Sequence, residues 1–526
     1  MKSQYLVVDK KWELPIILTS LFLGALVVRW LAILQNPVVA TDAIFYIKLA
    51  KLYSTGDYVA AFKLYPYGFF PLLIASFQKI CGDWALAGQW VSVLCGALTV
   101  IPLYLLARRI FDEKIALWGA IFYIISPNLV KYSAEVLRDI PFVFFYTTAL
   151  WWGLRGAKDG NMVSIALASV FVYLSSLFRA EGLPLLIILS LYLIWQGVGG
   201  GLSLKRMGAA LIILFLFFPA VVSPLGVYYS KKVGRLNLDQ LQAVKDHFTI
   251  SVSNSIIKKI EKEVENENLS LQGRNLFQLA RNHRFVIYSS HILYKTVKVF
   301  NILFLLFLFG LIKRRQIGYR QDEFLLFAIY VVFVPIFLLY LSASNYLSTR
   351  HPFPMVVPSL IWSGVGFVEI KERMILWMKG RDFPLRKQAL RWATPLLLLM
   401  ICVPLLSMAW APNRKDKLEL KEIGLWLKDH GYAHSVIIGQ GEFSRLAFYA
   451  DGEFIHLPKG SYEDTIRFAR KKEASILIIN KKTVESLSPN FLDMVSPRDL
   501  QQIEIPGIKT PKYATTVFLV KGVGEK

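Results

Sequence analysis

Long apolar runs separated by short polar segments dominate this chain of 526 residues. A helix needs about 20 mainly apolar residues to cross the roughly 30 Å hydrocarbon core of a bilayer. Runs that approach this length, several of them short, occur at 14–34, 84–107, 115–131, 139–154, 162–178, 183–199, 207–229, 294–312, 324–342, 353–369 and 391–411. The pattern predicts an α-helical polytopic membrane protein with about 11 transmembrane helices.

Two stretches lack such runs and are expected to lie in water. The first, 230–293, is polar and reads as a solvated helical insertion. The second, 412–526, contains the short apolar runs SVIIG, EFIHL, SILIIN and TTVFLV between helix-like stretches, which predicts a small α/β domain. We therefore divide the chain into a transmembrane domain, 1–411, with an outer loop at 35–83, and a soluble C-terminal domain, 412–526.

In a soluble chain, a formal charge of +23 would suggest nucleic-acid binding. Here the basic residues stand in short loops, which indicates that they set the membrane topology and contact anionic lipid. No nucleic-acid partner is expected. With the N-terminus inside, twenty-one basic residues fall in short cytoplasmic segments and eight in short outside segments. This asymmetry predicts that loop 35–83, the insertion and the C-terminal domain are outside. The membrane is expected to be a bacterial or archaeal cytoplasmic (inner) membrane. The first run is expected to be an uncleaved signal anchor.

Cysteine usage gives no sign of a metal or disulfide framework. The chain has three cysteines, an odd number, and two of them lie inside apolar runs. No cofactor is expected from the sequence, and a divalent metal ion stays an open alternative.

The outer segment after the first run, TDAIFYIKLAKLYSTGDY at 41–58, has an acidic head and a helical pattern. Tyr46, Leu49, Ala50 and Tyr53 recur at i, i+3, i+4 and i+7, which predicts a helix along the membrane interface. Asp42 would then stand just above the lipid. It either complements the dipole of a helix capped by Thr41 or takes part in chemistry.

Other ionisable residues stand at the predicted outer ends of the helices. In YSAEVLRDIPF, the spacing i, i+3, i+4 would place Glu135, Arg138 and Asp139 on one face of a continuing helix. Two further outer turns, LFRAEGLP and SNYLSTRHPFP, contribute Arg179, Glu181, Arg350 and His351. Charge beside hydrocarbon is costly and usually functional, so we expect these groups to converge on a site. The alternative is a solvated helix start in which an arginine is satisfied by two acids.

Several of these stretches resemble a known family. TDAIFYIKLAKLYSTGDY, LYPYGFFPLLIASF, GALTVIPLYLLARRIFDEKIALWGAIFYIISPNLVKYSAEVLRDIPFVFF and RHPFPMVVPSL are similar to the polyprenyl-phosphate-sugar glycosyltransferases of the GT-C class. Within it they resemble glycosyltransferase family 39, the protein O-mannosyltransferases and lipid A aminoarabinose transferases. The resemblance is specific over about 12–200, weaker to 370 and architectural beyond.

The resemblance implies an integral membrane enzyme that moves a sugar from a lipid-linked phosphate donor to an acceptor hydroxyl, with inversion, at the outer face. The acceptor would be a protein, a lipid or a glycan. Residues that match the family's motifs are Asp42, Tyr46, Gly56 and Asp57 in the first loop, the proline-rich turn Pro66 to Pro71, the third-loop acid Asp139, and Arg350. Tyr67 stands where the family commonly has a second proline. Ala43 stands where the family often has a second acid, so paired-acid metal binding is not expected of this loop.

The chemistry of such a transfer needs one base and a few cations. Because phosphate is already a stabilised leaving group, the enzyme must hold its oxygens and remove a proton from the acceptor. The candidate catalytic residues are Asp42, as the base, and Asp139. The candidate substrate-binding residues are Tyr46, Lys63, Tyr67, Glu135, Arg138, Arg179, Glu181, Arg350 and His351, of which the arginines and Lys63 could each hold phosphate.

Two other classes compete with this interpretation. A transporter or lipid flippase also has many spans, but its signature is polar groups midway along broken helices. A sensor or scaffold would use its outer α/β domain to bind a partner. The concentration of ionisable residues at one face favours an enzyme.

Overall fold

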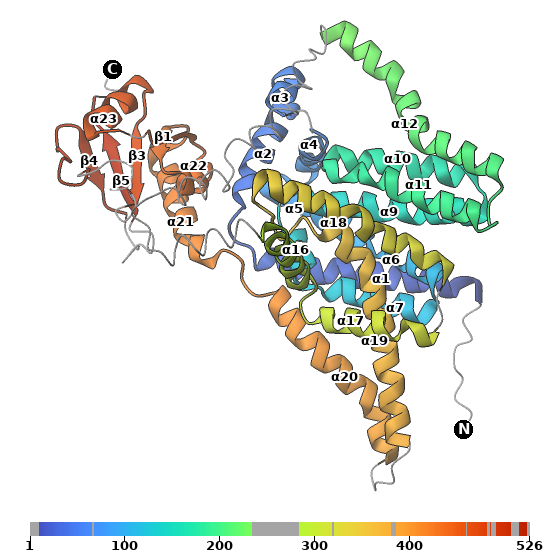
Figure 1. The fold of residues 1–526 in the computed structure, drawn as a ribbon. Helices are drawn as coiled ribbons and strands as arrows, with labels where there is room; N and C mark the ends of the chain where they lie inside the picture. Colours follow the sequence, from blue (N-terminus) through green and yellow to red (C-terminus); the bar gives the residue numbers. More distant parts are fainter. Residues whose placement is uncertain are drawn as a thin grey trace. The chain divides into compact units, whose positions relative to one another are not determined.

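The computed structural model describes residues 10–65, 68–233, 283–317, 320–379, 386–458, 460–480, 484, 491–505 and 515–522. Two compact units make up the chain (Figure 1). The first, the helical unit, comprises Met1–Ala32 and Leu52–Ala411, and the second, the C-terminal unit, comprises Ile33–Lys51 and Pro412–Lys526. Residues 33–51, which the sequence-based division placed in the transmembrane domain, thus group with the C-terminal unit.

Within the described residues, seven helical stretches are long and apolar enough to cross a bilayer. They lie in α1 (Lys10–Leu34), α5 (Trp84–Leu98) with α6 (Val100–Ile110), α11 (Pro184–Val198), α12 (Leu204–Val233), α18 (Phe324–Ser344), α19 (Phe353–Lys379) and α20 (Arg386–Ala409). Two bent pairs raise the number to nine if each is one span. The chain is an integral membrane protein, and the predicted count of 11 spans is not confirmed.

The bent pairs correct two predicted spans, 115–131 and 294–312. Helix α7 (Glu113–Ile125) meets α8 (Pro127–Ser133) at 56°, but α16 (Arg284–Phe300) meets α17 (Leu303–Ile317) at 108°. Neither run is therefore one straight helix: 115–131 breaks at Ser126, and 294–312 breaks after Phe300. Asn301 adopts a φ of +59° and its side chain accepts a hydrogen bond from the Ile302 N–H, so the helix ends there. Most of the predicted insertion 230–293 lies outside the described residues.

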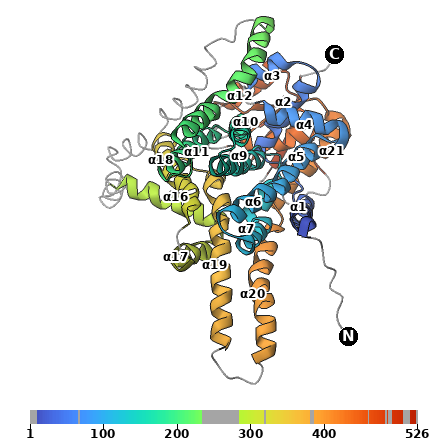
Figure 2. The same ribbon diagram turned by 90° about the vertical axis from the view of Figure 1, so that its right-hand side faces the viewer.

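Helix α19 is the packing centre of the helical unit, with α7 and α17 against it. Its contact with α17 depends on glycines: a Cβ on Gly310 would lie 2.0 Å from the Trp362 carbonyl, and one on Gly366 would lie 1.9 Å from the Leu306 carbonyl. Such small residues let membrane helices approach backbone to backbone. A second group, α9 (Asp139–Asp159), α10 (Met162–Phe178) and α11, lies side by side in both views (Figure 1, Figure 2).

Three short helices follow α1: α2 (Thr41–Ser54), α3 (Tyr58–Leu64) and α4 (Phe69–Cys81). The predicted helix over 41–58 is shorter because Gly56, with a φ of +82°, takes a backbone conformation that ends it. Asp57 then caps α3 by accepting a hydrogen bond from the Ala60 N–H at 3.0 Å. Gly56 and Asp57, which match the family motif, thus lie in the turn between α2 and α3.

The C-terminal unit contains the predicted α/β domain. Its sheet has the order β2-β1-β3-β5-β4, with β1 parallel to β2 and β3, and β5 antiparallel to β3 and β4. The four apolar runs form β1 (Val436–Gly439), β2 (Glu453–His456), β3 (Ile476–Asn480) and β5 (Thr515–Val520), whereas β4 (Leu500–Ile503) was not foreseen. The helices are α21 (Leu418–Leu427), α22 (Ser444–Tyr449) and α23 (Tyr462–Lys471).

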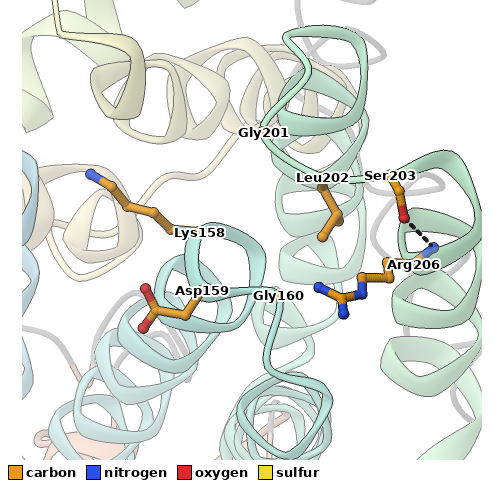
Figure 3. A pocket seen from close by; sticks show the side chains of 7 residues that line it. All are labelled: Lys158, Asp159, Gly160, Gly201, Leu202, Ser203 and Arg206. Atoms are coloured by element: carbon orange, nitrogen blue, oxygen red, sulfur yellow. Dashed lines mark hydrogen bonds between the residues drawn. The ribbon is translucent and has the colours of Figure 1, made fainter.

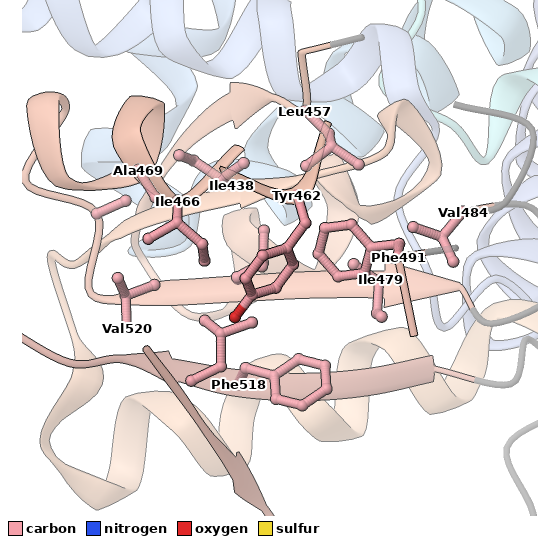
Figure 4. Packing of buried hydrophobic residues seen from close by; sticks show 13 residues of the cluster. Ile438, Leu457, Tyr462, Ile466, Ala469, Ile479, Val484, Phe491, Phe518 and Val520 are labelled. Atoms are coloured by element: carbon pink, nitrogen blue, oxygen red, sulfur yellow. The ribbon is translucent and has the colours of Figure 1, made fainter. Parts of the chain in front are cut away.

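The central strand β3 is buried on both faces, as a continuous apolar run predicts. Leu477 and Ile479 contribute to one core, with Tyr462 and Ile466 of α23 and Phe518 of β5 (Figure 4). Ile476 and Ile478 face the opposite core, which is closed by α21 and α22. The domain is therefore three-layered, with helices on both faces of the sheet.

Candidate active site

Charged residues from three separate helix ends meet in the helical unit, as expected for a site. Asp139 opens α9, Arg179 follows the last residue of α10, and Arg350 lies in the turn before α19. One carboxylate oxygen of Asp139 accepts from Arg179, and the other accepts from Arg350 at 3.2 Å. Asp139 is only 1% exposed. A buried carboxylate thus joins two arginines that are 171 positions apart in the sequence.

The ion-pair network extends to the short 3-10 helix η1 (Ala180–Gly182). Arg179 donates its second terminal nitrogen to Glu181, so it bridges two carboxylates. Nε2 of His351 lies 4.0 Å from Glu181, while Nδ1 accepts the Ser348 N–H at 2.9 Å. Burial, and next the positive charge of Arg179, lower the pKa of His351 to about 4. His351 is therefore neutral at pH 7.

Arg138, the residue before α9 and the sequence neighbour of Asp139, lies beside this network. Its Nη1 donates to the Tyr65 hydroxyl, and its guanidinium carbon lies 5.5 Å from the centre of that ring. Among the described residues it forms no ion pair with a carboxylate. We call Arg138, Asp139, Arg179, Glu181, Arg350 and His351 the arginine cluster. With His351 neutral, the cluster contains three guanidinium groups and two carboxylates, and a further buried carboxylate, Glu135, lies three residues before Arg138.

The helix predicted to carry Glu135, Arg138 and Asp139 on one face does not exist, and that prediction is wrong. Helix α8 ends at Ser133 and α9 begins at Asp139, with non-helical residues between them. Pro141 explains the break, because in a continuous helix its ring would clash with the carbonyl of residue 137. Glu135 is buried at 3% exposure in this connection.

Two of the first-loop candidates, Asp42 and Tyr46, lie in the C-terminal unit. Asp42 is exposed in the first turn of α2, and Tyr46 is buried at 7% exposure. The predicted apolar face of this helix is confirmed, since Leu49 and Ala50 are also buried. The Lys63 side chain and Tyr67 lie outside the described residues, so the structure does not place them.

A buried cation in the first span escaped the sequence interpretation. Arg29 of α1 is fully buried and donates to the Ser133 hydroxyl at 3.2 Å and to the Ala25 carbonyl at 3.3 Å. Its guanidinium carbon lies 4.6 Å from the centre of the Tyr123 ring. A single arginine inside an apolar run is itself a signal, because such charges are rare unless they have a role. Arg29 ties α1 to α8, which leads toward the arginine cluster.

The other end of α9 carries a separate cavity of about 390 Å³. It is lined by Lys158 and Asp159 of α9, by Gly160, and by Ser203 and Arg206 at the start of α12 (Figure 3). Since α9 has 21 residues, its two ends are about 30 Å apart, close to the thickness of the hydrocarbon core. The cavity and the arginine cluster therefore mark opposite ends of one helix.

Comparison with known proteins supports this architecture. Residues 68–228 match the family model described as dolichyl-phosphate-mannose-protein mannosyltransferase. A curated relative, the undecaprenyl phosphate-alpha-4-amino-4-deoxy-L-arabinose arabinosyl transferase of Pseudomonas aeruginosa, is 31% identical over 132 residues, which cover 24% of each chain. The matched segments span between 24% and 38% of the length of the curated relatives.

Solved structures match over most of the chain. ArnT from Cupriavidus metallidurans, bound to undecaprenyl phosphate, has a TM-score of 0.56 at 12% identity and covers 96% of this chain and 98% of its own. The Archaeoglobus fulgidus oligosaccharyltransferase has a TM-score of 0.53 at 14% identity and covers 90% of this chain and 70% of its own. The fold is that of the GT-C glycosyltransferases. The predicted resemblance to this class is confirmed, and it extends at the level of fold through the C-terminal domain.

Proposed function

We propose that this protein transfers a sugar from a polyprenyl-phosphate-linked donor to an acceptor hydroxyl on the extracytoplasmic side of the membrane, with inversion. The observation that carries the proposal is the arginine cluster, which gathers three guanidinium groups at helix ends in a GT-C fold. A phosphate group is the anion that such forked donors recognise best.

The three arginines have different roles in this proposal. Arg179 is held by two carboxylates, Asp139 and Glu181, so it serves as the frame of the site. Arg138 has only the neutral Tyr65 hydroxyl as a hydrogen-bond partner among the described residues, so its charge is the least compensated. Arg138 and Arg350 are therefore assigned to the phosphate oxygens of the donor, where they stabilise the negative charge of the leaving group.

The proposed reaction uses Asp42 as the general base. The acceptor oxygen attacks the anomeric carbon, the bond from that carbon to the phosphate oxygen breaks, and polyprenyl phosphate leaves with the bonding electrons. Asp42 takes the acceptor proton. Attack opposite the leaving group inverts the anomeric centre. Because both oxygens of Asp139 are engaged by arginines, Asp139 positions these side chains, and the base role falls to the exposed Asp42.

The proposed location is a bacterial or archaeal cytoplasmic membrane, with the N-terminus inside and α2 along the outer interface. Support for this orientation comes from the bias of twenty-one cytoplasmic against eight outside basic residues. The names of the matched relatives, which mention mannose and aminoarabinose on lipid phosphates, suggest the class of donor. The proposed partners are this donor, the bilayer and a protein, lipid or glycan acceptor.

The direct test incubates the purified protein with a panel of polyprenyl-phosphate sugars and candidate acceptors, and measures release of polyprenyl phosphate by mass spectrometry. The proposal expects one donor class to be consumed, with a product of inverted anomeric configuration. A parallel reaction with a metal chelator decides whether a divalent ion is needed. If no donor is consumed while flipping of a labelled lipid across vesicles is observed, the transferase proposal is wrong.

A further inference from the structure

The segment that connects α1 to α2, residues 35–40, is largely buried although it forms no helix or strand: Gln35 is exposed and Pro37 half-buried, and the other four residues are buried. Val38 is fully buried, and Val39 and Ala40 are each 7% exposed. The peptide groups of a buried irregular segment need hydrogen-bond partners, because each unsatisfied group is costly. Here the partners come from the C-terminal domain, which belongs to the same compact unit.

Four carbonyl groups of this segment accept hydrogen bonds from the region after residue 412. The donors and acceptors are the Asn413 N–H to Gln35 at 3.1 Å, Lys421 to Pro37 at 3.0 Å, Arg414 to Val38 at 3.4 Å and Arg445 to Val39 at 3.0 Å. Three of the four donors are cationic side chains. Hydrogen bonds from charged donors are stronger than those between neutral groups, so the segment is firmly held.

Two side chains of helix α22 bind both backbone polar groups of one residue in the segment, Val39. Arg445 Nε donates to the carbonyl of Val39, and the Val39 N–H donates to the Tyr449 hydroxyl at 2.9 Å. Arg445 and Tyr449 are four positions apart and therefore lie on one face of α22. Lys421 approaches the Tyr449 ring to 5.5 Å from its centre. We call Lys421, Arg445 and Tyr449 the loop clamp.

The clamped residue precedes Asp42 by three positions. The Ala43 N–H donates to the Ala40 carbonyl at 3.1 Å, so the chain passes directly from the clamped residue into the first turn of α2. Lys51, further along the same helix, pairs with Asp451 of the C-terminal domain at 3.4 Å. The segment that carries Asp42 is thus attached to the C-terminal domain on both sides of Asp42.

We propose that the C-terminal domain positions Asp42 for catalysis, with Arg445 and Tyr449 as positioning residues. This inference rests on the proposed function, in which Asp42 is the base. The physical reason is that a base displaced by about 1 Å costs on the order of a hundredfold in rate. Asp42 stands in the first turn of α2, directly after an irregular connection, so an unanchored connection would let that turn and its carboxylate sample many positions. The domain supplies the constraint that the connection itself lacks.

The test combines hydrogen exchange with turnover in the full-length protein. Tyr449→Phe removes the acceptor of the Val39 N–H and keeps the ring. Tyr462→Phe, a hydroxyl deletion in the opposite core of the same domain, is the matched control. We expect Tyr449→Phe to accelerate amide exchange in residues 36–44 about fivefold, the factor for one hydrogen bond of typical net strength, and the control to leave it unchanged.

For turnover, we expect Arg445→Met to lower kcat about ten- to a hundredfold with unchanged donor affinity, and Arg445→Lys to recover part of the loss. Wild-type kcat in both Arg445→Met and Tyr449→Phe, with unaltered exchange at 36–44, would overturn the inference. The exchange measurement does not depend on turnover. An inactive wild-type protein would therefore reject the proposed function, while the exchange data would still decide whether the clamp holds the segment.

Discussion

Asp139→Asn is the most informative perturbation of the arginine cluster. The amide keeps the shape of the side chain and removes the negative charge that Arg179 and Arg350 share. Because the carboxylate is 1% exposed, its loss leaves two guanidinium groups with one fewer anion in a site that solvent reaches poorly. Breaking a buried ion pair on one side costs about 3–5 kcal/mol, and we expect a loss of stability in this range.

The matched control lies at the other end of the same helix. Asp159 pairs with Arg109 and Arg155, but these three side chains are 37% to 44% exposed, so Asp159→Asn is expected to cost about 0–1 kcal/mol. Unfolding of both variants in mixed lipid–detergent micelles gives the two free energies. Donor affinity should also fall in Asp139→Asn alone. Equal, small losses in the two variants would show that Asp139 does not organise the cluster.

Three further predictions follow from the same structure. Arg138→Gln should weaken donor binding at least about tenfold with little loss of stability, since a neutral amide cannot replace the guanidinium charge that pairs with the donor phosphate. Unchanged affinity in a lipid-donor binding assay would show that Arg138 does not bind the phosphate. The pKa of His351 is about 4 in the folded protein and near 6.5 in the unfolded chain, so between these pH values the unfolded chain binds a proton that the folded protein does not. Stability should therefore fall as the pH falls from 6.5 to about 4. Over this range, thermal unfolding should show that His351→Gln loses up to about 3 kcal/mol less stability than the wild-type protein. In a cysteine-free background, Tyr346→Cys should react with an impermeant thiol reagent in intact cells and Lys205→Cys should not; the reverse pattern would invert the proposed orientation.

Much of the fold was predictable because hydrophobic periodicity depends on local sequence. The long apolar runs and four of the five strands of the C-terminal sheet were found in this way. Strand β4 was missed because LQQI has two consecutive glutamines, both exposed, and only its end residues face the protein. The bend after Phe300 was missed because apolar residues continue for more than two turns past Asn301, the residue at which α16 ends.

The site was predictable as a set of helix ends but not as a set of contacts. Topology alone indicated that Asp139, Arg179 and Arg350 would meet, since all three lie beside predicted outer turns. Which arginine pairs with which carboxylate could not be predicted, because ion pairs between residues far apart in the sequence depend on how the helices pack. The same holds for the loop clamp, where Arg445 and Tyr449 look like ordinary surface positions of a short helix until the tertiary structure brings Val39 to them.

The most direct test of the account is the turnover of Asp42→Asn with a donor that the wild-type protein consumes. Asparagine caps a helix about as well as aspartate, so folding and donor binding should persist. An amide cannot accept the proton, so kcat should fall by about two to four orders of magnitude. Asp57→Asn, which changes a carboxylate that caps α3, serves as the control and should retain activity. Wild-type turnover by Asp42→Asn would contradict the account.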